Sequence, residues 1–174
     1  MGGAVIGERN PDVGINENDM SIALLIEYGD FKYFIGGDIE HPTEGEIAER
    51  DLVMDVDVYH SNHHGSDTSS TPELVEDMKP TVIIISNGNH GLYKHPRKSI
   101  LNYYKNMSPE PTVFQTNKYL KGGKGGNVPD EFIADPETVH DTGTILVSVD
   151  ESNGTYEVSY RDQNHEFQIK RKGN

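Results

Sequence analysis

Three short apolar runs, each followed by residues that can bind a metal, constrain this chain more than any other feature of its sequence. The runs and the polar residues that follow them are 33–35 with Asp38, 56–59 with His63 and His64, and 82–85 with Ser86, Asn87 and His95. Such runs are typical of buried strands. Because open α/β sheets hold their ligands at the carboxyl ends of strands, we expect these polar residues to share one site.

Strand and helix signals alternate over residues 20–107, which predicts an α/β layered sheet. The expected elements are a hairpin over 20–35, a helix from Thr43 to about Leu52, a strand over 56–59, a helix opening at Pro72, a strand over 81–85 and a helix opening at Pro96. Thr43 and Glu46 have the spacing of a capping box at the start of the first helix. Pro72 suits a first-turn position, where its missing N–H costs nothing.

The pattern changes after Pro109, although the length still predicts one domain over residues 1–174. Residues 118–141 are rich in glycine and then in acidic residues, which predicts a surface loop. The remaining expected strands are 112–115, 144–149, 155–160 and 166–170, with turns at Asn153-Gly154 and Gln163-Asn164.

Composition excludes several classes of protein and site. The chain has no cysteine, so disulfides and thiolate metal sites are absent. No apolar run approaches the roughly 18 residues of a membrane span. The first residues lack the pattern of a signal peptide, and both cytoplasmic and extracytoplasmic locations stay open. A net charge of −14 makes nucleic acid an unlikely ligand for this chain alone, because nucleic-acid surfaces are normally basic. A phosphate ester held through bound cations remains compatible with that charge.

Each motif also has a simpler structural interpretation. Asp38 after two glycines could cap a turn, the His63-His64 pair could lie in a solvated loop, and His95 could precede a helix start. The joint order of the three motifs, each at the end of an expected strand, favours a functional site over these separate explanations. Imidazole and carboxylate are common metal ligands, and imidazole is a versatile acid or base.

Four motifs in a fixed order carry a resemblance to a known family. They are residues 34–38 (FIGGD), 57–66 (DVYHSNHHGS), 84–88 (IISNG) and 95–96 (HP). Together they resemble the late-competence DNA-uptake (ComEC-like) branch of the metallo-β-lactamase superfamily. Asp141 and Thr142 before a later strand also fit that pattern.

The resemblance implies an αββα hydrolase with two divalent metals, zinc or manganese, that acts on phosphate esters. Asp38 would bridge the metals and His64 would be the last histidine ligand. His63 would hold or protonate the substrate phosphate, and His95 would lie at the rim as a second catalytic group. The implied substrate contacts are Ser66, Ser86 and Asn87.

One departure from the family is large, because the His-x-His-x-Asp-His motif that supplies most metal ligands is absent from this sequence. The match therefore covers the C-terminal half of such a domain only. The chain could be a fragment, a degenerate half-fold, or a half that needs a separate N-terminal partner. We expect half of a dinuclear phosphodiesterase-like hydrolase, inactive in isolation. The alternative is a non-catalytic acidic module that associates with a partner or with itself through an unpaired apolar sheet face.

Overall fold

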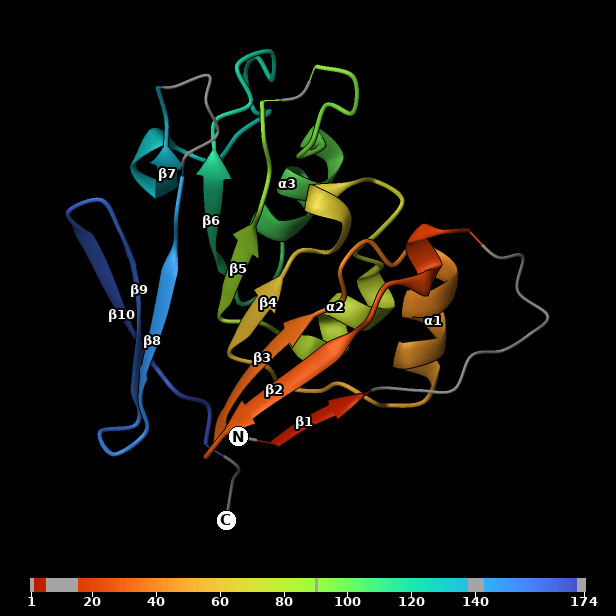
Figure 1. Cartoon of the computed structure of the whole chain (residues 1–174), viewed down its shortest axis with the longest axis vertical. Coiled ribbons are helices and arrows are strands. Elements are labelled where there is room, and N and C mark those ends of the chain that lie inside the picture. Colours follow the sequence, from red (N-terminus) through yellow and green to blue (C-terminus); the bar gives the residue numbers. More distant parts are fainter. Residues whose placement is uncertain (1, 6–15, 90, 138–142, 172–174) are drawn as a thin grey trace.

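The predicted α/β architecture is confirmed in a computed structural model, which describes residues 2–5, 16–89, 91–137 and 143–171 (Figure 1). A seven-stranded mixed sheet carries its three α-helices on one face and a three-stranded antiparallel sheet on the other. Within these residues no helix has both the length and the apolar character needed to cross a membrane.

The large sheet places its strands side by side in the order of the sequence. These strands are β1 (Gly2–Val5), β2 (Leu24–Tyr28), β3 (Phe31–Ile35), β4 (Val58–His60), β5 (Val82–Ile85), β6 (Thr112–Asn117) and β7 (Ile133–Asp135). The first three strands pair antiparallel, and β3 to β7 pair parallel. The carboxyl ends of β3, β4 and β5 therefore meet at one edge, as the sequence predicts.

The helices are α1 (His41–Glu49), α2 (Pro72–Met78) and α3 (Lys98–Lys105), with short 3₁₀ turns η1 (Asn18–Met20), η2 (Asn62–Gly65) and η3 (Asp130–Phe132). The expected start of α2 is confirmed: Pro72 is the first helical residue and the Thr71 side chain accepts a hydrogen bond from the N–H of Leu74. The prediction of a capping box at Thr43 is wrong. The Thr43 hydroxyl donates instead to the carboxylate of Asp19 at 2.9 Å, and α1 begins two residues earlier.

Two apolar clusters hold the layers together, one on each face of the large sheet. Phe34, Tyr59 and Ile83 belong to the cluster under the helices, whereas Val58, Val82 and Ile84 belong to the cluster under the small sheet. Alternate residues of the central strands thus face opposite layers, as the pleat requires.

The small sheet consists of β8 (Leu146–Asp150), β9 (Thr155–Tyr160) and β10 (Gln163–Gln168), with β9 in the centre. The turn predicted at Gln163-Asn164 is wrong, because both residues belong to β10 and pair with Tyr160 and Ser159. The chain reverses at Arg161 instead, which has a positive φ of 48°.

The acidic end of the predicted 118–141 loop contains structure that composition did not indicate. All three residues of β7 are buried, and β7 extends the large sheet beside β6. A strand of three residues is too short to show an alternating pattern. Residues 138–141 of that predicted loop, and the Asp141-Thr142 motif, lie outside the described residues.

A buried carboxylate fastens the two sheets together. Asp57 is fully buried, and its side chain accepts the backbone N–H of Lys32 at 2.8 Å and that of Lys170 at 2.7 Å. The Tyr156 hydroxyl from β9 donates to the Asp57 carbonyl at 3.2 Å. The segment after β10 is thereby attached to the start of the strand that leads to the histidines.

Candidate functional site

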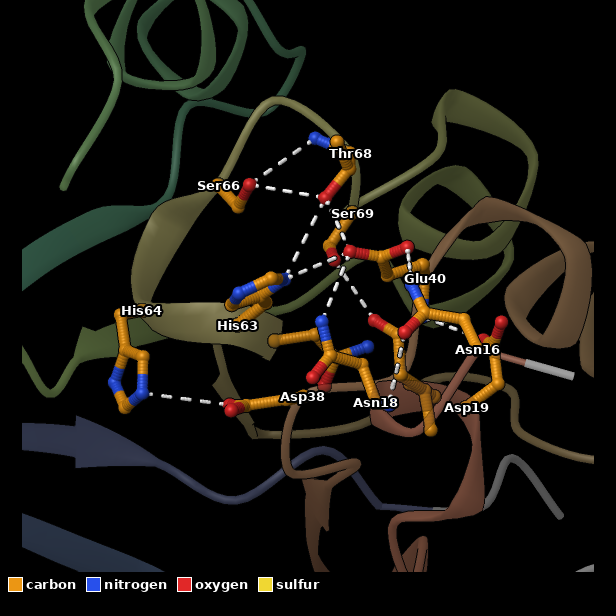
Figure 2. A network of polar contacts seen from close by, with 12 residues as sticks. Asn16, Asn18, Asp19, Asp38, Glu40, His63, His64, Ser66, Thr68 and Ser69 are labelled. Atoms are coloured by element: carbon orange, nitrogen blue, oxygen red, sulfur yellow. Dashed lines mark hydrogen bonds and ion pairs between the residues drawn. The ribbon is translucent and has the colours of Figure 1, made fainter. Parts of the chain in front are cut away.

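Asp38 and His64 face each other across the carboxyl ends of β3 and β4. Asp38 Oδ1 lies 3.4 Å from His64 Nε2, and both side chains are partly exposed (Figure 2). His64 Nδ1 lies 2.7 Å from the Ser86 carbonyl, which can only accept, so Nδ1 carries a proton there. In the neutral ring the Nε2 lone pair then points toward Asp38. Two lone-pair donors directed at the same space are a suitable pair of ligands for one cation.

Local backbone geometry explains how these two side chains approach each other. Gly37 has a positive φ of 61°, and the N–H of Asp38 donates to the Ser21 hydroxyl at 3.1 Å. His63 and His64 are both left-handed, with φ of 48° and 57°. A left-handed backbone conformation costs a non-glycine residue about 1–2 kcal/mol, so the surrounding contacts must hold the histidine pair in place.

His63 points in a different direction from His64, toward Glu40. Its Nδ1 lies 3.2 Å from Glu40 Oε1 (Figure 2). Partial burial alone would raise the pKa of Glu40. Hydrogen bonds from Asn18, Thr68 and Asn16, together with nearby His63, hold that pKa below its ordinary value. An ionised carboxylate beside Nδ1 orients the imidazole and leaves Nε2 for another contact.

His95 joins the two histidines from the segment before α3. Its ring centroid lies 5.3 Å from that of His63 and 6.5 Å from that of His64. Burial, followed by the charges of His63, Arg97 and His64, lowers the pKa of His95 to about 4. In the described part of the chain, the buried Nδ1 of His95 has no hydrogen-bond partner. The structure therefore brings Asp38, His63, His64 and His95 together at one edge of the sheet.

The three predicted substrate contacts lie near this edge but make contacts within the protein. The Ser66 hydroxyl is buried 3.0 Å from that of Thr68. The Ser86 hydroxyl lies 2.8 Å from His60 Nε2. Asn87 is buried, and its side-chain amide donates to the Asn117 carbonyl at 2.8 Å. Their roles as substrate contacts stay predictions.

Sequence reasoning missed the polar residues beneath the histidines. Glu44 and Asn62 are fully buried and hydrogen-bonded to each other at 2.7 Å. Tyr104, also fully buried, places its hydroxyl 2.8 Å from that of Ser61 and 2.7 Å from that of Ser70. Burial raises the pKa of Glu44, and this effect is opposed by hydrogen bonds from Asn62, Thr71 and Ser70. No periodic pattern marked Glu44, because it is one of four glutamates within residues 40–49.

The described residues do not complete a metal site. No group of three or more histidine, cysteine, aspartate or glutamate side chains in the part of the chain that the structure describes is arranged to hold an ion. Asp38 and His64 would supply two ligands, whereas a zinc ion takes about four, including any water.

Comparison with known proteins finds relatives that match part of this chain. No family profile matches the chain. Among curated proteins, it is similar to ComE operon protein 3 of Bacillus subtilis, with 30% identity over 104 residues that cover 60% of this chain and 13% of that protein. It is also similar to recombination protein 2 of Haemophilus influenzae, with 34% identity over 85 residues, or 49% of this chain and 10% of that protein. By their names, the first is a protein of the ComE operon and the second is a recombination protein.

A third relative is named as a competence protein. Competence protein ComA of Neisseria gonorrhoeae is 29% identical over 91 residues, which are 51% of this chain and 13% of that protein. The chain thus spans only about a tenth of the length of the relatives that it matches.

Proposed function

We propose that this chain is the C-terminal half of a dinuclear metal-dependent hydrolase of the metallo-β-lactamase type, in a competence-related protein. The observation that carries this proposal is the convergence of Asp38, His63, His64 and His95 at the carboxyl ends of β3 to β5. The similarity to competence proteins supports the biological context. The ordered motifs support the reaction type.

The proposed substrate is a phosphate ester, cleaved in the manner of a phosphodiesterase or nuclease. Asp38 and His64 would each give a ligand to zinc or manganese, and the remaining ligands would come from an N-terminal half. Among the described residues His63 is the best placed to contact a phosphate oxygen, because Glu40 fixes its Nδ1 and leaves Nε2 available. His95, which is neutral at pH 7, would accept or donate a hydrogen bond at the rim. The isolated chain should therefore be inactive.

The first test is bound metal per chain, measured by elemental analysis of tag-free protein incubated with Mn²⁺ or Zn²⁺. We expect less than one ion per wild-type chain, and none in Asp38→Ala or His64→Ala. The second test extends the polypeptide upstream in its own gene and measures hydrolysis of bis(p-nitrophenyl) phosphate with Mn²⁺. Activity that appears only in the extended protein, and disappears on Asp38→Ala, is the expected result.

Absence of both metal and activity in the extended protein would overturn the hydrolase proposal. A simpler observation bears on the same point. A His-x-His-x-Asp-His motif encoded within roughly 100–150 residues upstream, about one further half-domain, supports it.

A second candidate function is a partner-binding or self-associating module, and an exposed apolar stripe favours it. Ile22, Ile26 and Tyr28 are 70%, 40% and 51% exposed. Ile26 and Tyr28 pair with Tyr33 and Phe31 of β3, which belong to the cluster under the small sheet. The stripe therefore continues that face of the large sheet beyond the area that the small sheet covers. Solvent-exposed apolar patches often mark interaction sites.

Sedimentation velocity distinguishes this module from a half-enzyme that is monomeric alone. Concentration-dependent association of the wild type, abolished by Ile22→Ser with Ile26→Ser, is the expected result for the module. A matched control is Leu146→Ser, since Leu146 is 59% exposed but lies on the separate small sheet. A monomer at all concentrations would exclude self-association through the stripe.

A further inference from the structure

We propose that Glu44 is a positioning residue of the candidate site: through Asn62, it fixes the loop that carries His63 and His64 against the loop that carries Asp38. The inference rests on the proposed function for its chemical purpose, but its geometric content can be tested without any metal. Glu44 touches neither Asp38 nor the histidines, and its effect on them is indirect.

The Asn62 side chain spans the distance between α1 and the end of β3. Its amide nitrogen donates to Glu44 Oε1 at 2.7 Å, and its amide oxygen accepts the N–H of Gly36 at 3.1 Å. Both Glu44 and Asn62 are completely buried. Water is therefore a poor substitute for either contact, and loss of one would leave a buried polar group unsatisfied.

The carboxyl oxygens of Glu44 set the orientation of that amide. Both oxygens accept N–H groups, Oε1 from Ser70 and Oε2 from Thr71, so the Asn62 NH₂ group faces Oε1 as a further donor. The Asn62 oxygen then faces the Gly36 N–H. A flipped amide would oppose its oxygen to the carboxylate and its NH₂ group to the N–H of Gly36, and both contacts would be repulsive.

The two loops that Asn62 connects are the one that carries Asp38 and the one that carries His63 and His64. Gly36 is two residues before Asp38, and Asn62 is directly before His63. A second hydrogen bond, from the N–H of His63 to the Gly37 carbonyl at 2.9 Å, joins the same loops. These two hydrogen bonds hold the left-handed histidine pair in the position that places His64 Nε2 3.4 Å from Asp38 Oδ1.

The remaining contacts of Glu44 show why this position requires a carboxylate. Ser70 N–H donates to Oε1 and Thr71 N–H donates to Oε2, each at 2.7 Å. All three partners are therefore N–H donors. A glutamine has one oxygen and one NH₂ group, so at least one of these donors would face another donor.

The experiment is amide hydrogen exchange measured by NMR on the full chain without metal. Glu44→Ala, which removes the acceptor of the Asn62 amide, is compared with wild type and with Glu49→Ala, a matched control at the exposed end of the same helix. We expect exchange of the Gly36 and His63 amides to rise at least about tenfold in Glu44→Ala, which corresponds to about 1.4 kcal/mol. Exchange of the Ile84 and Ile85 amides in central strand β5 should change less than about twofold. A purely structural role would accelerate both groups alike.

Equal acceleration of the loop and β5 amides, or no change at Gly36 and His63, would overturn the proposal. If Glu44→Ala does not fold, Asn62→Ala decides, because it leaves Ser70 and Thr71 bonded to Glu44. It should accelerate exchange at Gly36 and leave the α2 amides unchanged. Unchanged exchange at Gly36 in Asn62→Ala would equally refute the proposal.

A separate measurement keeps this inference distinct from the proposed function. Titration calorimetry with Mn²⁺ alone should show at least about tenfold weaker binding to Glu44→Ala than to Glu49→Ala. Because Asp38 and His64 are only two ligands, absence of measurable Mn²⁺ binding to the wild type is compatible with the proposed half-site, and the exchange data then decide the role of Glu44. Wild-type-like Mn²⁺ affinity in Glu44→Ala would contradict its positioning role.

Discussion

Replacement of Asp57 by alanine should strongly destabilise the protein. The Asp57 side chain is fully buried and accepts two backbone N–H groups, those of Lys32 and Lys170. Alanine removes both acceptors at once. Neither N–H can turn toward solvent without movement of β3 or of the segment after β10.

The magnitude follows from the two donors left without partners. Each buried unsatisfied N–H costs about 1–3 kcal/mol, so the expected loss is about 2–6 kcal/mol of unfolding free energy. The Lys170 ammonium also loses a neighbouring negative charge. Burial lowers the pKa of Lys170 and the charge of Asp57 opposes that shift, so the variant should lower this pKa further. A loss of this size is a large fraction of a typical domain stability of about 5–15 kcal/mol.

Urea unfolding followed by circular dichroism at pH 7 measures this loss. Asp55→Asn is the matched control, since Asp55 is exposed, lies two residues away and forms a 4.0 Å ion pair with Lys79. Its effect should stay within about 0.5 kcal/mol. An Asp57→Ala protein within 1 kcal/mol of wild type would refute the reasoning, because it would mean that water or a backbone shift satisfies both N–H groups.

Two further predictions concern the site. Gly36→Ala should lower the free energy of unfolding by about 1–3 kcal/mol, because the new Cβ would lie 2.5 Å from Asn62 Oδ1. Gly45→Ala in α1, with no described atom within 4 Å of the new Cβ, should raise it by about 0.5–1 kcal/mol. Urea unfolding of the two variants checks both values, and equal effects would contradict the packing argument. The lowered pKa of His95, about 4, means that the folded state stays neutral while the unfolded state gains a proton below pH 6.5. Stability linked to His95 is thus complete above pH 6.5 and is lost as the pH falls toward 4, by at most about 1.4 kcal/mol per pH unit and less because the ring is partly exposed. His95→Gln should abolish this part of the loss, and an NMR titration of the His95 ring with a midpoint near 6.5 would contradict it.

The order and type of the main elements could be predicted because they depend on local patterns. Residues 82–85 are four consecutive β-branched apolar residues, and all four are buried in β5. Pro72 and Thr71 start α2 through local geometry alone. Predictions failed where a distant residue took over a local signal, as Asp19 does with the Thr43 hydroxyl.

The candidate site was likewise predictable where it depends on local patterns and unpredictable where it depends on distant contacts. That Asp38, His63, His64 and His95 would share one edge followed from strand ends in a parallel sheet. The partners that orient them did not follow, because Glu40 and Asn62 act through contacts between segments more than 20 residues apart. A single sequence contains no signal for such pairs.

The strand order of the large sheet has a consequence for how the chain folds as it is synthesised. Each strand from β2 to β7 pairs with the strand made just before it, so the sheet can grow one strand at a time as the chain leaves the ribosome. The Asp57 side chain is different, because its bond to Lys170 joins residues 113 positions apart. Attachment of the strand that leads to the histidines must therefore wait until Lys170 has emerged. A nascent chain paused before that point would have the seven-stranded sheet in place, but the Asp57 carboxylate would accept only the N–H of Lys32 and not yet that of Lys170.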